Sequence, residues 1–260
     1  MKHYKVIIIS LLIFFAICGV AAANGLFGPP QFGAKDTGWL HTGIGYWHHE
    51  DKFDGDGDYL IGQKQLYSEV GYVTNNYWDI YVRVGISDLN IADAFSSTSA
   101  ASFASKNDFA DNMNYFSTFG TKGFYPFGKT CGIGAFIQGT YYFRDFTDDV
   151  SGTRNGAPLN IELRIKNLWN VNFGIGLQAT APYGIKLYLG PYVYYSEAKV
   201  SPSTNFTGLA LASGEMTIKN KTSLGGFSGI EVPLAKGFRL NVEGQYSERL
   251  SAGAAVTYAY

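Results

Sequence analysis

Short runs in which apolar residues alternate with polar or small ones dominate this chain after residue 23. In YWDIYVRVGISD, the aliphatic side chains at 80, 82, 84 and 86 and Trp78 share one face of a strand, and the other face is polar or small. The segments GIGAFIQGTYYFRDF, WNVNFGIGLQA and FRLNVEGQY repeat this pattern. Each run has about ten residues, the length that a tilted β-strand needs to cross a bilayer. No apolar stretch after residue 23 is long enough to cross as a helix, so a helical membrane protein is excluded.

The scarcity of charge indicates that lipid, and not water, covers much of the surface. Charged residues make up 16% of the chain, against about 25% in an ordinary soluble domain. A secreted lipocalin-like barrel or a β-sandwich would also alternate, but its wet face would carry many Lys and Glu side chains. Here the polar positions of the runs are mostly Gly, Asn, Gln, Tyr and Thr, and the charges gather between the runs. The soluble alternative is therefore disfavoured.

The connections between the runs favour a barrel with two different ends. Short turns near Asn75, Pro126, Pro182 and Pro233 alternate with long polar segments, which are HEDKFDGDGD, residues 88–114, TDDVSGTRNGAPLN and SPSTNFTGLALASG. Outer-membrane barrels have short periplasmic turns and long outer loops. We therefore predict an all-β fold, a single antiparallel up-and-down transmembrane β-barrel of about ten strands, with eight or twelve as alternatives. The role of the 88–114 segment, a mobile loop or a short helix at the mouth, is left open.

The first 23 residues have the pattern of a secretory signal. Two lysines precede an apolar run of about fifteen residues, and small side chains at Ala21 to Ala23 suit a signal peptidase. We predict cleavage after Ala23, so that residues 1–23 are a signal peptide used in Sec export and residues 24–260 form the barrel. The mature chain would hold one cysteine, Cys131, and can form no internal disulfide. Its eighteen basic and twenty-one acidic residues give no basic surplus that would favour nucleic acid.

The last residues, AGAAVTYAY, alternate up to an aromatic terminus. A closing strand of this kind leaves no open sheet edge in lipid and places Tyr260 in the interfacial aromatic girdle. In these residues the sequence resembles the bacterial outer-membrane β-barrel proteins. The resemblance implies that Val256, Tyr258 and Tyr260 are read by the barrel-assembly machinery and that outer-membrane lipid and lipopolysaccharide surround the barrel. Because the chain stops where the barrel closes, we expect no appended peptidoglycan-binding domain.

The strand pattern directs a set of charged side chains into the lumen. They are Glu69, Asp79, Arg83, Lys122, Arg144, Lys186, Arg239 and Glu243. Buried charges need partners or water. Paired charges would close the barrel and make it a surface or structural protein, whereas a wet lumen would make it a small porin-like channel. Five inward tyrosines and the small width of a ten-stranded barrel favour the narrow, closed lumen; the tyrosines are Tyr81, Tyr142, Tyr188, Tyr192 and Tyr194.

Two polar clusters raise the question of metal binding. Asp54, Asp56 and Asp58 offer oxygen ligands that could bind Ca²⁺, although the stretch lacks the Gly and Glu of an EF-hand and a solvated acidic turn is the simpler interpretation. His48 and His49 are adjacent and would face opposite sides of a strand, so they are not expected to share an ion.

Catalysis has little support in the sequence. Some outer-membrane barrels are enzymes with sites at the rim, and His41 lies within the first expected strand. No serine elbow or other nucleophile motif accompanies it. We expect no enzymatic activity and no cofactor, with a rim-located barrel enzyme as the remaining alternative.

Overall fold

The computed structural model describes residues 25–31, 40–55, 58–74, 77–95, 102–103, 106–154, 156–204 and 215–260. Residues 1–23 therefore lie outside the described residues. The strands are β1 (Leu40–Asp54), β2 (Asp58–Thr74), β3 (Trp78–Ile91), β4 (Ser102–Phe103), β5 (Phe109–Pro126), β6 (Cys131–Tyr142), β7 (Phe146–Arg154), β8 (Ala157–Thr180), β9 (Lys186–Thr204), β10 (Met216–Asn220), β11 (Leu224–Ala235), β12 (Phe238–Tyr246) and β13 (Leu250–Ala259). In this part of the chain, no helix is long and apolar enough to cross a membrane.

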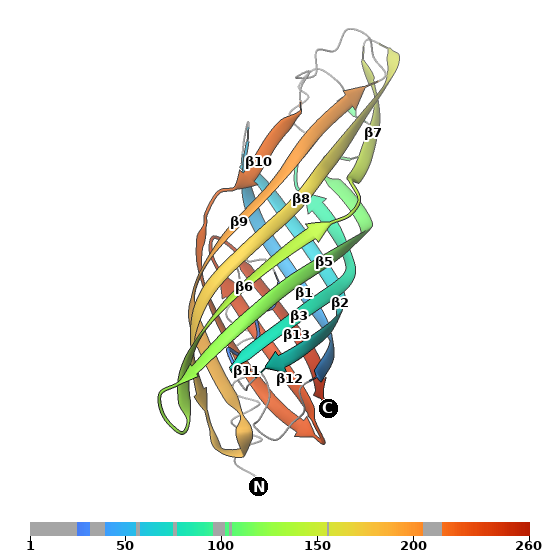
Figure 1. Cartoon of the computed structure of the whole chain (residues 1–260). Helices are drawn as coiled ribbons and strands as arrows, with labels where there is room; N and C mark the ends of the chain where they lie inside the picture. The colour runs from blue at the N-terminus through green and yellow to red at the C-terminus, as the bar shows by residue number, and fades with distance from the viewer. Residues whose placement is uncertain are drawn as a thin grey trace, which may run out of the picture.

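Ten of these strands close into an antiparallel barrel (Figure 1). Its order is β1, β2, β3, β5, β6, β8, β9, β11, β12 and β13. The ring closes where β13 pairs with β1, with Ala259 opposite His41 and Ala252 opposite His48. The amide of Tyr260 also donates to the Leu40 carbonyl at 3.1 Å. The prediction of an antiparallel barrel of about ten strands is confirmed.

An apolar belt surrounds the part of the barrel next to the short turns. On β3 the outward side chains from Trp78 to Ile86 are apolar, and on β1 the apolar series ends at Tyr46. Aromatic side chains mark both edges of the belt: Tyr258 lies between Phe238 (4.7 Å) and Tyr260 (4.9 Å) at the end with short turns. At the opposite edge the Trp169 and Tyr195 rings are 5.4 Å apart. Such girdles mark the two interfaces of an outer-membrane barrel, and the short-turn end is the periplasmic one.

Among the described residues, three of the four segments that were expected to be long loops are instead mostly strand; in the fourth, SPSTNFTGLALASG, residues 201–204 end β9 and residues 205–214 lie outside the described residues. The acidic stretch after His49 continues β1 to Asp54 and returns as β2 from Asp58, and TDDVSGTRNGAPLN forms the β7–β8 hairpin. The 88–114 segment ends β3 at Ile91, contains β4 and starts β5 at Phe109. We call the sheet beyond the belt the extension; it comprises residues 48–54, 58–64, 88–91, 109–113, 146–166, 197–204 and 216–220.

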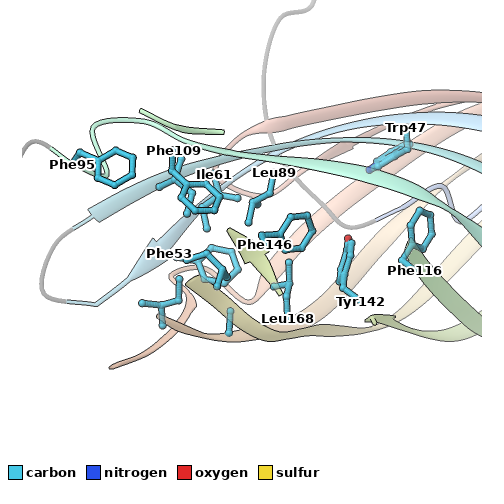
Figure 2. Close-up of a cluster of buried hydrophobic side chains, with 14 of the residues drawn as sticks. Trp47, Phe53, Ile61, Leu89, Phe95, Phe109, Phe116, Tyr142, Phe146 and Leu168 are labelled. Atoms are coloured by element: carbon cyan, nitrogen blue, oxygen red, sulfur yellow. The ribbon is translucent and has the colours of Figure 1, made fainter. Parts of the chain in front are cut away.

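The extension reverses the chemistry of the belt. Most of its outward side chains are polar, such as His48, Glu50 and Lys52 on β1, and most of its inward side chains form an apolar core (Figure 2). That core contains Phe53, Ile61, Leu89, Ile91, Phe109, Phe146, Val150, Leu159, Ile161, Ile165, Ala198 and Ile218. Water surrounds this part of the sheet, so the apolar side chains turn inward as in a soluble protein. A β-bulge between Lys166 and Trp169, with Asn167 at φ 51°, switches the facing of β8 between the two regions.

Candidate functional site in the barrel lumen

The residues Gly25–Gln31 occupy the lumen within the belt. We call this segment, GLFGPPQ, the plug. Its residues from Gly25 to Pro30 are buried, and Phe27 is 0% exposed. The Phe27 ring lies among three aromatic rings of the barrel wall, 4.1 Å from Phe136, 5.2 Å from Tyr192 and 5.3 Å from Phe227 between centroids.

Glu243 of β12 holds the middle of the plug. Its Oε1 accepts the Phe27 amide (2.8 Å) and its Oε2 accepts the Gly28 amide (2.7 Å). Gln245 Nε2 (2.6 Å) and Tyr188 OH (2.9 Å) complete the shell around the carboxylate. Each of the two carboxylate oxygens therefore accepts two hydrogen bonds.

The ends of the plug are held by other lumen side chains. Gln245 Nε2 donates to the Gly25 carbonyl (2.7 Å), and Arg83 Nη1 donates to the Leu26 carbonyl (2.6 Å). At the periplasmic mouth, Lys186 Nζ donates to the Gln31 carbonyl at 2.7 Å. The Gln31 amide donates to Gln178 Oε1 at 2.9 Å. The plug therefore runs from the middle of the lumen down to the periplasmic mouth.

Glycine at position 28 is required by the backbone and by the space around it. Gly28 has φ +74°, a left-handed conformation that side chains disfavour. A Cβ atom there would also lie 3.0 Å from Lys122 Nζ and 3.1 Å from Asn241 Nδ2. The close approach of the plug backbone to the barrel wall depends on this residue.

Seven of the eight charged side chains expected in the lumen lie there and are buried. Arg83 contacts Glu69 at 2.6 Å and stacks over the rings of Tyr67 and Tyr81, while Lys122 lies over Tyr81. Glu231 joins the set by binding Arg239 (2.8 Å) and Lys186 (3.1 Å). Buried charges need partners of opposite sign. The seven expected side chains that are buried in the lumen are Glu69, Asp79, Arg83, Lys122, Lys186, Arg239 and Glu243.

Arg144 is the exception, and its expected place in the lumen is wrong. β6 ends at Tyr142, so the alternation that would turn Arg144 inward does not continue to it. Arg144 is exposed beside Phe143, which is 60% exposed. The five tyrosines that were expected to face inward are all buried.

The histidines occupy different environments. His41 Nε2 lies 2.9 Å from Asp79 Oδ1, and its Nδ1 lies 3.6 Å from Glu69. His49 faces inward and contacts the Ser251 hydroxyl at 3.0 Å, whereas His48 faces outward near Glu50. The adjacent histidines thus face opposite sides of β1.

The acidic tip of the β1–β2 hairpin forms no metal site among the described residues. Asp54 and Asp58 are directly paired across the β1–β2 turn, and both carboxylate oxygens of Asp58 lie within 2.8 Å of Lys221 Nζ. Asp56 lies outside the described residues. Within the described ranges, no group of three or more His, Cys, Asp or Glu side chains is placed to hold a metal ion.

Sequence reasoning missed the plug and several lumen side chains that hold it. Glu231, Gln178 and Gln245 lie on the polar face of expected strands and could have been found from the alternation. The plug itself has no strand pattern. Its one sequence signal is an apolar, Gly- and Pro-containing stretch directly after the expected cleavage site, which differs from the polar linker expected at a free terminus.

Comparison with solved structures identifies the fold. The translocator domain of the autotransporter NalP from Neisseria meningitidis matches with a TM-score of 0.51 and 12% identity, over 87% of this chain and 90% of that one. The outer-membrane protease OmpT from Escherichia coli matches with a TM-score of 0.49 and 12% identity, over 89% and 100%. No protein-family model and no curated protein sequence matches the chain. The chain has the fold of a bacterial outer-membrane β-barrel.

Proposed function

We propose that the protein is a closed outer-membrane barrel that acts as a surface or structural protein and does not conduct solutes. The observation that carries this proposal is the filled lumen. The plug and its charged partners fill the belt region. The apolar core shown in Figure 2 fills the inside of the extension. A solute would have to displace both layers, which are held by different kinds of contact.

The extension is the proposed working surface. β8 continues beyond the belt from Leu168 to Ala157, about 12 residues or roughly 40 Å of strand. Its core of buried apolar side chains favours a rigid projection over a set of mobile loops. A rigid projection suits a protein that presents a fixed surface outside the cell.

We infer no enzymatic role. His41 is buried in the plugged lumen, and a hydrogen bond to Asp79 within the lumen network accounts for its Nε2 contact. A catalytic site needs access for substrate, and the plug and the charged network lie around these groups.

The route to the membrane forms part of the same proposal. Residues 1–23 would direct Sec export and be removed, and the assembly machinery would read Val256, Tyr258 and Tyr260 on β13. The outward placement of Val256 and the packing of Tyr258 between Phe238 and Tyr260 support an interfacial position for these side chains. Outer-membrane lipid and lipopolysaccharide would surround the belt.

Single-channel recording tests the closed barrel. The mature chain is refolded, its folding is verified by heat-modifiable gel migration, and it is inserted into planar bilayers. We expect folded protein without current steps. Discrete steps whose size changes in Arg83→Ala or Lys186→Ala would contradict the proposal and make the protein a small channel with a charge-lined lumen.

A further inference from the structure

The plug is bound in the barrel in the way that a peptide ligand is bound. Six hydrogen bonds join side chains of the barrel wall to main-chain atoms of the plug, between Gly25 and Gln31. Among the described residues, no main-chain hydrogen bond joins the plug to a strand, and the ring closes through β1 and β13 without it. The plug is therefore an occupant of the lumen and not a part of the sheet.

The Phe27 ring fits a recess of the wall. The three surrounding rings come from separate strands, Phe136 from β6, Tyr192 from β9 and Phe227 from β11, and their centroids lie 4.1 to 5.3 Å from that of Phe27. Phe136 and Phe227 also pack against each other at 5.5 Å. Because these rings surround a single side chain of the plug, the recess favours an aromatic residue at this position.

Pro30 has a recess of its own, which two glycines provide. Gly134 of β6 and Gly176 of β8 are directly paired, and Pro30 lies against both. A Cβ atom at Gly134 would lie 2.5 Å from Pro30 Cβ, and one at Gly176 would lie 3.1 Å from Pro30 Cγ. Gly28 adds a third requirement, because its backbone conformation and the space around it disfavour a side chain. The wall thus fits a phenylalanine, then a glycine, and a proline two positions after the glycine.

The contacts divide their roles as those of a peptide-recognition site do. Hydrogen bonds to the main chain hold an extended peptide, and pockets for individual side chains select its sequence. We propose that the lumen is a peptide-binding site, that the plug is its tethered ligand, and that the site also accepts a segment with the same Phe-Gly-x-Pro pattern from a second protein.

The direction of the plug indicates how such a partner is presented. Gln31 lies at the periplasmic mouth, where Lys186 binds its carbonyl, and Gly25 lies in the middle of the lumen. A peptide bound in the same direction enters from the periplasm with its amino-terminal end first. The partner is therefore a periplasmic protein that carries the pattern in its amino-terminal segment.

The tether keeps a partner out while the plug is intact. A ligand joined to its own site by a short flexible linker competes at an effective concentration of about 1 mM, so a free peptide must exceed this level to replace it. Phe27 is 0% exposed, and loss of its ring should weaken the binding of the plug by about a hundredfold. The site becomes available to a second peptide when the plug is weakened in this way.

Binding of a labelled peptide to a plug variant tests the proposal. The mature chain carrying Phe27→Ala is refolded in detergent, and its folding is verified by heat-modifiable gel migration. The peptide GLFGPPQ, labelled at its carboxyl end, is added and its binding is followed by fluorescence anisotropy. We expect saturable binding that is about a hundredfold tighter than binding to the unaltered chain, whose own plug competes. Absence of saturable binding to the folded variant would overturn the proposal.

Control peptides and wall variants separate recognition from adsorption. Alanine in place of the phenylalanine or the glycine of the peptide should weaken its binding by about tenfold or more, and equal binding of these peptides would overturn the proposal. In the Phe27→Ala chain, Glu243→Gln should weaken peptide binding by about tenfold, because the peptide amides lose an acceptor. Glu50→Gln, which faces outward on the extension, should leave binding unchanged. Equal affinities of these two wall variants would also overturn the proposal.

A second plug variant covers a failure to fold. If Phe27→Ala gives no heat-modifiable form, Pro30→Ala takes its place, since it empties the recess over Gly134 and Gly176. The same peptide and the same criteria then apply. Failure of peptide binding is distinct from failure of the closed barrel, because the closed barrel is tested by current through the unaltered chain without peptide.

Discussion

Glu243 holds two consecutive amides of the plug, so at the scale of single residues it is the strongest test of how the lumen is filled. Glu243→Gln places an amide NH₂ group against at least one N–H donor of Phe27 or Gly28. We expect a loss of about 1–3 kcal/mol in the free energy of unfolding in lipid vesicles, the usual cost of an unsatisfied buried donor. An equal loss in a chain lacking residues 25–31 would contradict the assignment, since the plug amides are then absent.

A second prediction concerns aromatic rings that lie over glycines on neighbouring strands. Tyr81 is directly opposite Gly120, and a Cβ atom at Gly120 would lie 2.3 Å from the tyrosine ring. Gly120→Ala should destabilise the barrel by about 1–3 kcal/mol through overpacking. Gly62→Ala is the matched control, because nothing lies within 4 Å of its Cβ position. Equal urea midpoints for the two variants would contradict this account of the lumen packing.

Individual lumen residues were predictable wherever a strand was regular. Alternation alone directed Arg83, Lys186 and Glu243 inward, because one face of each strand contacts lipid. It failed for Arg144, which follows the end of β6, and it said nothing about which carboxylate holds the plug. The two-residue alternation shows which face of a strand a side chain lies on. It does not show which residue of another segment that side chain contacts.

At the scale of elements, the extension should unfold independently of the belt. Phe146 on β7 is 0% exposed and packs 5.6 Å from the Tyr142 ring. Phe146→Ala should weaken the extension by about 3–5 kcal/mol, the usual cost of removing a buried phenylalanine. Limited proteolysis should then cut the extension faster while heat-modifiable migration persists.

The neighbouring aromatic provides the control for that experiment. Phe143→Ala removes a ring that is 60% exposed, so protease resistance should change little. If the two variants were cut at the same rate as the unaltered chain, the apolar core would not be what stabilises the extension.

The extension also explains why the strand ends were mispredicted. Charged residues at every second position, such as Glu50 and Lys52, suggested polar loops because the belt carries its polar side chains inward. Beyond the membrane the outward face of a strand contacts water, so its polar side chains point outward and its apolar side chains point inward. The alternation is the same as in the belt, but the two faces are exchanged. Recognising this required the apolar partners Phe53 and Ile61 to be considered together with the charges.

At the scale of the whole molecule, the plug and the extension close the barrel in two layers. Deleting residues 25–31 removes one layer, and the core around Phe53, Phe109 and Phe146 remains above it. The deletion variant, if folded, should show no current steps in planar bilayers, although its heat-unfolding temperature should fall. Steps in the deletion variant alone would mean that the plug is the only barrier.

The ten-stranded architecture followed from patterns that extend along the whole chain, namely the alternation, the turns and the closing strand. The seating of the plug could not follow from them, because it depends on contacts between residues more than 200 positions apart, such as Phe27 and Glu243. Such long-range contacts form only when the barrel has closed, so no local stretch of the sequence reveals them.

Hydrogen exchange at the plug amides tests the central claim most directly. In the refolded mature protein, the amides of Phe27, Gly28 and Gln31 are bonded to Glu243 and Gln178 inside the lumen. The account predicts that they exchange as slowly as amides of the barrel strands. Exchange of these three amides at the rate of an unstructured peptide, in a barrel that is otherwise protected, would contradict it.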